Sequence, residues 1–327
     1  MEWSERTGRR LKLRDLHILL TVAQCRSIAK AADQLAVSQP VVSKSIADLE
    51  RMLKVRLIDR DRHGAEPTIY GEALLKRGTI AFDELRQGVE DVEFLVDPTV
   101  GRLRIGTSAG MDAGLIPAIV DRLSRRYPGM TFDVALLSNL LLLQELRARN
   151  VDLVIGRWPR SIAEPDVNLE ILYDDPIFVV AHKSSAWARR RRVELAEIVN
   201  ENWLFPAPGQ LVLMLAAEAF RAKGLEMPRA VVATGSLPMH FAMLATGRFL
   251  GIYSKSVILL GAQQLSLKIL PIDLSGQSTT IGIMTSKNRT LNPLTKLFVD
   301  CARDVTKSFA SISLTTRYKR GSRRTES

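Results

Sequence analysis

The chain has 327 residues, of which 46% are apolar and 25% are charged. This length exceeds one ordinary hydrophobic core and indicates two or three domains, and the normal charged fraction excludes a fibrous or wholly disordered protein. The formal net charge of +11 suits a polyanionic partner, but much of the excess lies in the last 21 residues, with 6 Lys and Arg against 1 acidic residue. Total charge alone is therefore weak support for DNA binding.

Cysteine and histidine usage argues against metal and disulfide chemistry. The two cysteines, Cys25 and Cys301, form no Cys-x-x-Cys pair, and the four histidines are scattered. We therefore expect reduced thiols, no metal and no cofactor. The N-terminus lacks the apolar segment of a secretory signal, and the stretch 134–146 is too short and too polar to span a bilayer. These features predict a soluble cytoplasmic protein without membrane contact.

Residues 11–68 have the pattern of a compact helical module after a disordered leader, 1–10. We expect an amphipathic helix over 14–24, a short helix over 28–35 capped by Ser27, and a third helix capped by Ser38. Pro40 is tolerated in the first turn of that third helix. The apolar face of the first helix is expected at Leu13, Leu16, Leu20 and Ala23, and that of the third at Val42, Ile46, Leu49 and Leu53.

A long helix is predicted over 69–96, capped by Thr68 and ended by Asp97 and Pro98. Its apolar residues fall near heptad spacing at Leu74, Gly78, Ala81, Leu85, Val89, Val92 and Val96. A helix of this length with such a seam usually finds a partner helix. The alternative is that the seam packs on its own chain.

After Pro98 strands and helices alternate, which implies βαβ units and a largely parallel sheet. Strands are expected at 103–106, 130–137, 151–155, 177–181, 230–233 and 250–253, with crossing strands at 267–270 and 280–285. Helices are expected at 115–127, 140–148, 212–223 and 237–246, and a final helix capped by Asn292 ends near residue 307. The remaining residues, 308–327, resemble a frayed basic tail.

Two short helices joined by a tight turn form a helix-turn-helix at 28–47, in which Ala31 and Ala32 allow a close crossing. The second helix of such a unit enters the major groove with its N-terminal end, so Gln39, Pro40, Ser43, Lys44 and Ala47 would face solvent or DNA. Gln can bond adenine edges and Lys can reach guanine or phosphate. Arg60 and Arg62 are placed to contact backbone phosphates. Many helical domains with such turns never bind DNA, and the pattern alone leaves both interpretations open.

The module resembles the DNA-binding domain of LysR-type transcriptional regulators. The resemblance rests on Leu13-Arg-Asp-Leu-His-Ile-Leu, Ser27-Ile-Ala-Lys-Ala-Ala-Asp-Gln-Leu, Ser38-Gln-Pro-Val-Val-Ser-Lys-Ser-Ile and Leu49-Glu50, and covers residues 11–71 with high specificity. It places base-reading positions at Gln39, Pro40, Ser43 and Lys44. We predict further DNA contacts at Ser27, Ser38, Arg60 and Arg62. The sequence departs from the family pattern at Lys44, Ile58, His63, Pro67 and Tyr70, which puts the phosphate contacts of the wing in doubt.

The resemblance also implies the layout of the rest: an α/β protein with an N-terminal winged helix-turn-helix, a long linker helix and a two-lobed domain like a periplasmic binding protein. The expected boundaries are 11–68 for the DNA-binding domain, 69–97 for the linker, 98–307 for the effector-binding domain (lobe I 98–174 and 276–307, lobe II 175–275) and 308–327 for the tail. The implied partners are promoter DNA, a small-molecule inducer, further copies in a homodimer or homotetramer, and RNA polymerase as a candidate.

Ligands of open α/β lobes lie at the carboxyl ends of strands and at helix N-termini. Three loops fit, and the resemblance places them in the cleft between the lobes, where Tyr253 could approach. Their residues are Ser108, Ala109, Ser138, Asn139, Thr234 and Ser236. Each of these serines could equally be a simple helix cap. The uncharged polar lining, with Arg157 nearby, suits a hydroxylated or carboxylated metabolite.

The competing interpretation is an enzyme or a transport-type binding protein with an accessory helical domain. No phosphate-binding loop, metalloprotease motif or dinucleotide fingerprint occurs, and none of the four histidines has an evident nucleophile partner. The arginine run 189–192 favours a solvated turn over a nucleic-acid patch. The family's peroxide sensors use two cysteines within the sensing domain, which disfavours redox sensing for Cys25 and Cys301. We therefore predict a regulator and not an enzyme.

Overall fold

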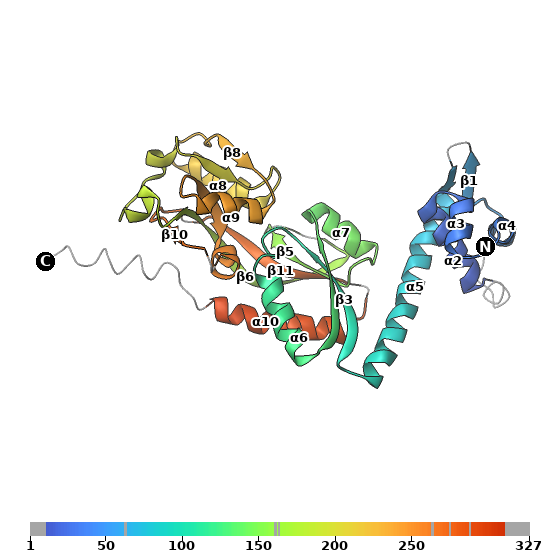
Figure 1. Cartoon of the computed structure of the whole chain (residues 1–327). Helices are drawn as coiled ribbons and strands as arrows, with labels where there is room; N and C mark the ends of the chain where they lie inside the picture. Colours follow the sequence, from blue (N-terminus) through green and yellow to red (C-terminus); the bar gives the residue numbers. More distant parts are fainter. Residues whose placement is uncertain are drawn as a thin grey trace. The chain divides into compact units, whose positions relative to one another are not determined.

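The structure is a computed structural model that describes residues 11–61, 64–159, 162, 164–262, 265–274, 276–287 and 289–310. The chain divides into two compact units between Val89 and Glu90. Figure 1 labels the helices and strands of each unit. The expected leader, 1–10, and nearly all of the expected tail lie outside the described residues.

The first unit is a helical module with a two-stranded wing. Its elements are α2 (Leu13–Cys25), α3 (Ile28–Gln34), α4 (Gln39–Leu53), β1 (Ile58–Asp61), β2 (Gly64–Pro67) and the start of α5 (Ile69–Val96). Its core includes Leu19, Val22, Val42 and Ile46, all fully buried. Ala31 and Ala32 are buried as expected, which lets the three short helices pack closely.

The predicted apolar face of α2 is correct at Leu16, which is buried, and wrong at Leu13, whereas Leu20 and Ala23 are half-buried. Leu13 is 51% exposed, and the buried face is made by Leu16, Ile18, Leu19 and Val22. Apolar residues at four of the five positions 16–20 make the stripe so broad that spacing alone cannot fix its centre. Packing against α3 and α4 decides the orientation instead.

The helix caps are confirmed at Ser27 and Thr68 but not at Ser38. The Ser27 hydroxyl accepts from the Lys30 amide at 3.4 Å, and the Thr68 hydroxyl accepts from the Gly71 amide at 3.1 Å. The Ser38 side chain makes no capping hydrogen bond. The reason is local: Pro40 has no N–H to cap, and the Val41 amide is already bonded to the Ser38 carbonyl.

The second unit contains a nine-stranded sheet in the order β4-β3-β5-β11-β6-β9-β7-β8, with β10 added to β6. Its strands are β3 (Val100–Thr107), β4 (Gly129–Leu136), β5 (Leu153–Trp158), β6 (Val167–His182), β7 (Trp203–Phe205), β8 (Ala230–Ala233), β9 (Leu250–Ser254), β10 (Leu267–Ile269) and β11 (Ser278–Ser286). Its helices are α6 (Leu115–Arg126), α7 (Asn139–Arg147), α8 (Leu211–Ala222), α9 (Leu237–Ala245) and α10 (Pro293–Ala310), with short turns η1 (Ala186–Arg189), η2 (Leu195–Ile198) and η3 (Val257–Gly261).

The sheet forms two lobes, each covered by helices on both faces (Figure 1). In lobe I, which holds β3, β4, β5 and β11, alternate strand residues pack on α6 and α10 or on α7. In lobe II, which holds β7, β8 and β9, they pack on α8 or on α9. This two-sided burial is typical of α/β domains and leaves the strand ends open for ligands.

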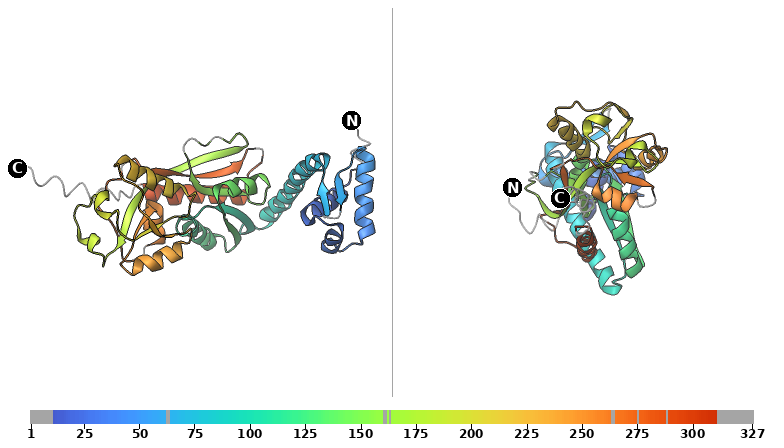
Figure 2. Two further views of the ribbon diagram at one scale, coloured as in Figure 1. Left: turned by 90° about the horizontal axis from the view of Figure 1, so that it is seen from above. Right: turned by 90° about the vertical axis from the view of Figure 1, so that its left-hand side faces the viewer.

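The expectation of a largely parallel sheet is wrong at the junction of the lobes. Parallel pairs join β3 to β4 and β5, and β7 to β8 and β9. However, β6 and β11 run antiparallel to their neighbours, since they carry the chain out of lobe I and back again (Figure 2). β10, expected as a crossing strand, instead pairs with the end of β6 in lobe II.

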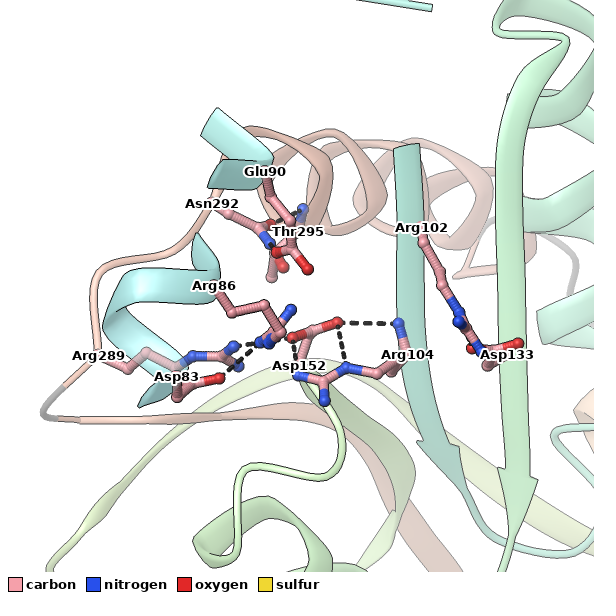
Figure 3. A network of polar contacts seen from close by, with 10 residues as sticks. All are labelled: Asp83, Arg86, Glu90, Arg102, Arg104, Asp133, Asp152, Arg289, Asn292 and Thr295. Atoms are coloured by element: carbon pink, nitrogen blue, oxygen red, sulfur yellow. Dashed lines mark hydrogen bonds and ion pairs between the residues drawn. The ribbon is translucent and has the colours of Figure 1, made fainter. Parts of the chain in front are cut away.

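A buried ion cluster joins residues in or next to three neighbouring strands of lobe I, namely β3, β5 and β11 (Figure 3). The Asp152 carboxylate, fully buried, accepts from the Arg104 guanidinium at 2.8 Å and from Arg289 at 2.8 Å. Burial alone would raise the pKa of Asp152, but the hydrogen bonds and charge of Arg104 and the charge of Arg289 outweigh it and lower that pKa. Beside it, Arg102 and Asp133 form an exposed ion pair.

Candidate functional site

The front of α4 presents an open polar face. Gln39, Pro40 and Lys44 are exposed and Ser43 is half-buried, whereas Val42, Ile46 and Leu49 on the opposite face are buried. The predicted recognition residues thus share one accessible surface at the start of the helix. A helix with this division can lay its outer face in a groove without losing its core contacts.

The turn before α4 fixes where that face points. Ala36 adopts the left-handed conformation, with φ of 52°, and the Val37 amide donates to the Ala32 carbonyl at 3.0 Å. These contacts end α3 and redirect the chain within three residues, as the sequence predicted. The strained Ala36 therefore helps to set the angle between α3 and α4.

Two contacts that sequence reasoning missed anchor the back of α4. The Ser45 hydroxyl donates to Asp15 of α2 at 2.7 Å. The Glu50 carboxylate accepts from the amides of Leu57 and Ile58 at 2.8 and 3.2 Å. Glu50 thereby joins the recognition helix to the start of the wing. Its position in the family-like motif marked it, but only the fold shows which backbone groups it satisfies.

The wing is a short antiparallel ribbon in which Arg60 pairs with Ala65 and is exposed. Gly64, with φ of 138°, brings the ribbon so close to α2 that an added Cβ would lie 2.6 Å from the Arg26 carbonyl. The predicted contact residue Arg62 lies outside the described residues, as does His63. The other predicted DNA contacts lie at helix starts: Ser27 is half-buried before α3, and Ser38 is exposed before α4.

A cavity of about 360 Å³, including its open mouth, lies between the lobes of the second unit. Lobe I and the junction contribute residues from β5 and the loop after β3, and lobe II contributes the starts of α8 and α9 and the end of β9. The lining residues are Ala109, Gly110, Arg157, Pro206, Gln210, Val212, Thr234, Gly235, Leu237, His240, Ile252, Tyr253, Ser254 and Val257.

The predicted effector residues fall into two groups. Ala109, Thr234 and Tyr253 line the cavity, whereas Ser108, Ser138, Asn139 and Ser236 are not among its lining residues. Ser138 and Ser236 cap α7 and α9. Ser108 accepts from the Arg157 amide at 3.3 Å, and Asn139 donates to the Arg157 carbonyl at 2.7 Å. A role of these four residues in effector binding stays a prediction.

Arg157 is the central side chain that the candidate loops did not include. Its Nη1 donates to the Ala109 carbonyl at 2.6 Å and its Nη2 to the Ser254 hydroxyl at 2.6 Å. The nearest carboxylate, Asp175 of β6, is 3.4 Å from Nη2. Gly110 fits closely against it, because a Cβ there would lie 2.7 Å from Nη1. A single arginine within the otherwise apolar strand β5 was the available sequence signal.

His240 and Tyr253 form a second polar pair on the lobe II wall. The His240 Nδ1 and the Tyr253 hydroxyl lie 2.9 Å apart. Burial lowers the pKa of His240, partly offset by the Phe205 backbone, and burial raises the pKa of Tyr253. Both groups are therefore neutral at neutral pH.

Comparison with known proteins identifies both units. Residues 13–72 match the profile of the bacterial regulatory helix-turn-helix proteins of the lysR family, and residues 97–307 match that of the LysR substrate binding domain. The chain belongs to the LysR family of transcriptional regulators. It carries the helix-turn-helix DNA-binding domain and the effector-binding domain of such regulators.

Relatives of this LysR-family regulator cover nearly its whole length. It is 26% identical over 285 residues to the HTH-type transcriptional regulator GbpR of Azospirillum brasilense, covering 87% of this chain and 83% of GbpR. It is 24% identical over 284 residues to the transcriptional dual regulator GltC of Bacillus subtilis, covering 86% and 93%. These relatives agree with the family assignment.

Solved structures show the same fold. Full-length OxyR from Pseudomonas aeruginosa, as a single-residue variant, aligns with a TM-score of 0.66 at 20% identity, over 90% of this chain and 95% of that one. CbnR, solved in complex with its target DNA, aligns with a TM-score of 0.61 at 20% identity, over 90% and 99%.

The remaining sequence expectations concern membrane spans, metal sites, the arginine run and the two cysteines. Within the described ranges, no helix combines the length and apolarity needed to cross a membrane, and no cluster of possible metal ligands occurs. The arginine run is exposed, with Arg190 and Arg192 paired to Glu197 and Glu194. Cys25 and Cys301 are both free thiols, and burial raises the pKa of Cys301.

Proposed function

We propose that this regulator binds promoter DNA with the exposed start of α4 and the wing, and that a small molecule bound between the lobes controls its effect on transcription. The observation that carries the proposal is the division of α4 into a buried apolar face and an open face holding Gln39, Ser43 and Lys44. We further propose that it acts in the cytoplasm, without catalysing a reaction, as a homodimer or homotetramer, and that RNA polymerase is a partner.

Each recognition residue has a contact that its chemistry supports. Gln39 offers the paired donor and acceptor that match an adenine edge, and Lys44 reaches guanine or phosphate. Arg60 on the exposed wing supplies a phosphate contact, as we propose for Arg62. Ser27 and Ser38, at the starts of two helices, would bond phosphate oxygens, which favour helix N-termini.

Binding of labelled DNA from upstream of the gene tests the recognition face. Because each good base contact is worth about 1–3 kcal/mol, Lys44→Ala and Ser43→Ala should each weaken specific binding by about 5- to 150-fold. Arg51→Ala, at the opposite end of the same helix and exposed, is the matched control. If both recognition variants bind like the unmodified chain, the assigned face is wrong.

A phosphate contact differs from a base contact in its salt dependence. Arg60→Ala should weaken binding to specific and unrelated DNA alike, and it should reduce the slope of log affinity against log salt by about 0.9. Loss confined to the specific sequence would instead assign Arg60 to base reading.

The predicted seam of α5 has two different environments. Leu74 packs in the core of the first unit, and Gly78 contacts Leu16. The N-terminal half of α5 therefore packs against its own chain. Toward the C-terminal end Val89, Val92 and Val96 are 59%, 60% and 82% exposed. Exposed apolar residues at this spacing support self-association through this half of the helix.

Sedimentation velocity tests this assembly. Val92→Glu should shift the regulator toward a smaller species, because it buries a charge in the proposed helix pair. Glu93→Gln, on the adjacent exposed position, controls for a change of charge alone. An unchanged assembly in Val92→Glu would remove α5 from the interface.

A further inference from the structure

The side chains that line the interlobe cavity carry positive charge only. Of its lining residues, Arg157 alone belongs to the strongly ionised types, and no Asp or Glu is among them. His240 stays neutral because burial lowers its pKa. A cavity with this lining attracts an anion and disfavours a cation.

Arg157 has hydrogen-bonding capacity left over. The side chain is 7% exposed, and its two terminal nitrogens are used by Ala109 and by the hydroxyls of Ser254 and Ser256. Its Nε is buried and has no hydrogen-bond partner among the described residues. A buried unpartnered donor is costly, which makes an acceptor from a ligand favourable there.

The nearby carboxylate of Asp175 is only loosely hydrogen-bonded to Arg157. Both oxygens of Asp175 are taken by Ser256, from its amide at 2.8 Å and its hydroxyl at 2.5 Å. The contact from Asp175 to Arg157 is longer, at 3.4 Å. The guanidinium can therefore donate to a second carboxylate, and the negative charge of Asp175 opposes a ligand that carries more than one carboxylate.

Two helices add to the positive potential. The 12-residue α8 begins after Gln210, and the 9-residue α9 begins after Ser236. Residues from both helix starts, including Val212 and Leu237, line the cavity. The positive ends of two helix dipoles thus lie at the same cavity as Arg157.

The rest of the wall is apolar. Pro206, Val212, Leu237, Ile252 and Val257 supply hydrocarbon surface. Such a wall stabilises an apolar group by about 25 cal/mol per Å² removed from water, whereas a small inorganic anion would leave it unfilled.

We infer that the cavity takes a small organic acid with one carboxylate and an apolar body, and that the carboxylate binds Arg157. The inference rests on the proposed function only in treating the cavity as the effector site. Because Arg157 also bonds Ser254, the ligand acts on a side chain that joins β5 of lobe I to β9 of lobe II.

Thermal unfolding and calorimetric binding of the full chain test the inference with three acids: benzoate, phenylacetate and 4-methylpentanoate. Their amides match them in shape but lack the charge, and sulfate is an anion without an apolar body. We expect at least one acid to bind at millimolar concentration, at least about tenfold more tightly than its amide. Binding of none of the acids, or equal binding by amide or sulfate, would overturn the inference.

Substitutions in the cavity test whether Arg157 supplies the positive charge that binds the acid. Arg157→Gln should weaken binding of the acid at least about tenfold, and Arg157→Gln combined with Asp175→Asn serves if the single variant fails to fold. Val212→Phe narrows the cavity at its apolar wall without changing the charge. It should also weaken binding of the acids, and the effect should be greatest for the largest acid. Acid binding that survives both changes would place the ligand elsewhere.

DNA binding of the same preparations separates the two hypotheses. Retained promoter binding without acid binding would overturn the ligand class and leave the proposed function intact. Acid binding by a chain that does not bind its promoter would overturn the proposed DNA-binding function and leave the ligand class intact.

Discussion

Replacing Asp152 with Asn removes the anion between Arg104 and Arg289 at almost constant shape. The carboxylate is fully buried and bonded to both guanidinium groups at 2.8 Å. Breaking a buried ion cluster by removing one partner typically costs about 3–5 kcal/mol, because the remaining charges stay buried. For a unit of this size that loss corresponds to a fall in Tm of about 6–20 °C.

Thermal and urea unfolding followed by tryptophan fluorescence measure the effect, since Trp158 and Trp203 are buried in the sheet of the same unit. The matched control is Asp133→Asn, which breaks the exposed pair with Arg102 and should cost at most about 1 kcal/mol. Equal effects of the two substitutions would refute the assignment of stability to burial of the cluster.

The pH dependence of unfolding provides a second test of the stability that Asp152 contributes. The pKa of Asp152 in the folded chain lies below its ordinary value of 3.8. A lowered pKa contributes stability that is complete above the unfolded value and is lost as the pH falls through the folded value. The advantage of the unmodified chain over Asp152→Asn should therefore persist from neutral pH to about 3.8 and shrink below it. An advantage that grows in acid would contradict this account.

Substitutions at four further positions test the DNA-binding unit and the loops of the sensing domain. Glu50→Ala should destabilise the first unit by about 1–3 kcal/mol, because two backbone amides lose their acceptor; Glu50→Gln, which keeps an acceptor oxygen, should cost less in the same unfolding experiment. Ala36→Gly should raise stability by up to about 1 kcal/mol, since φ of 52° favours Gly, whereas a lower Tm would contradict strain at this turn. Ser108→Ala and Ser236→Ala should spare promoter binding but blunt the response to an inducer in a reporter assay, and normal induction in both would limit these serines to structural roles.

Local signals predicted the helices well. The long helix has the predicted bounds, Ile69–Val96, because Thr68 caps its start and Pro98 follows its end closely. The face of α4 was also predicted, since its apolar residues recur at a clear helical period. Sequence patterns report such short-range effects directly.

Long-range pairing accounts for what the sequence did not reveal. Nothing local marks β6 as a single strand of 16 residues shared by both lobes, or sets its antiparallel direction. Arg157 became central only because folding brings Ala109, Asp175 and Ser254 around it. Polar residues in loops were easier to notice than a buried arginine in a strand, although two of the chosen serines cap helices.

The continuity of β6 limits how the sensing domain can move. Up to Pro176 this strand is hydrogen-bonded to β11, and from Ile177 onward it is hydrogen-bonded to β9. Wide separation of the lobes would have to rupture one of these ladders, and each exposed backbone group would then need a new partner. Bending or twisting near Pro176, which has no N–H to lose, keeps both ladders intact. The signal from a bound effector is therefore expected to be a bend or twist of β6 near Pro176 rather than a complete separation of the two lobes.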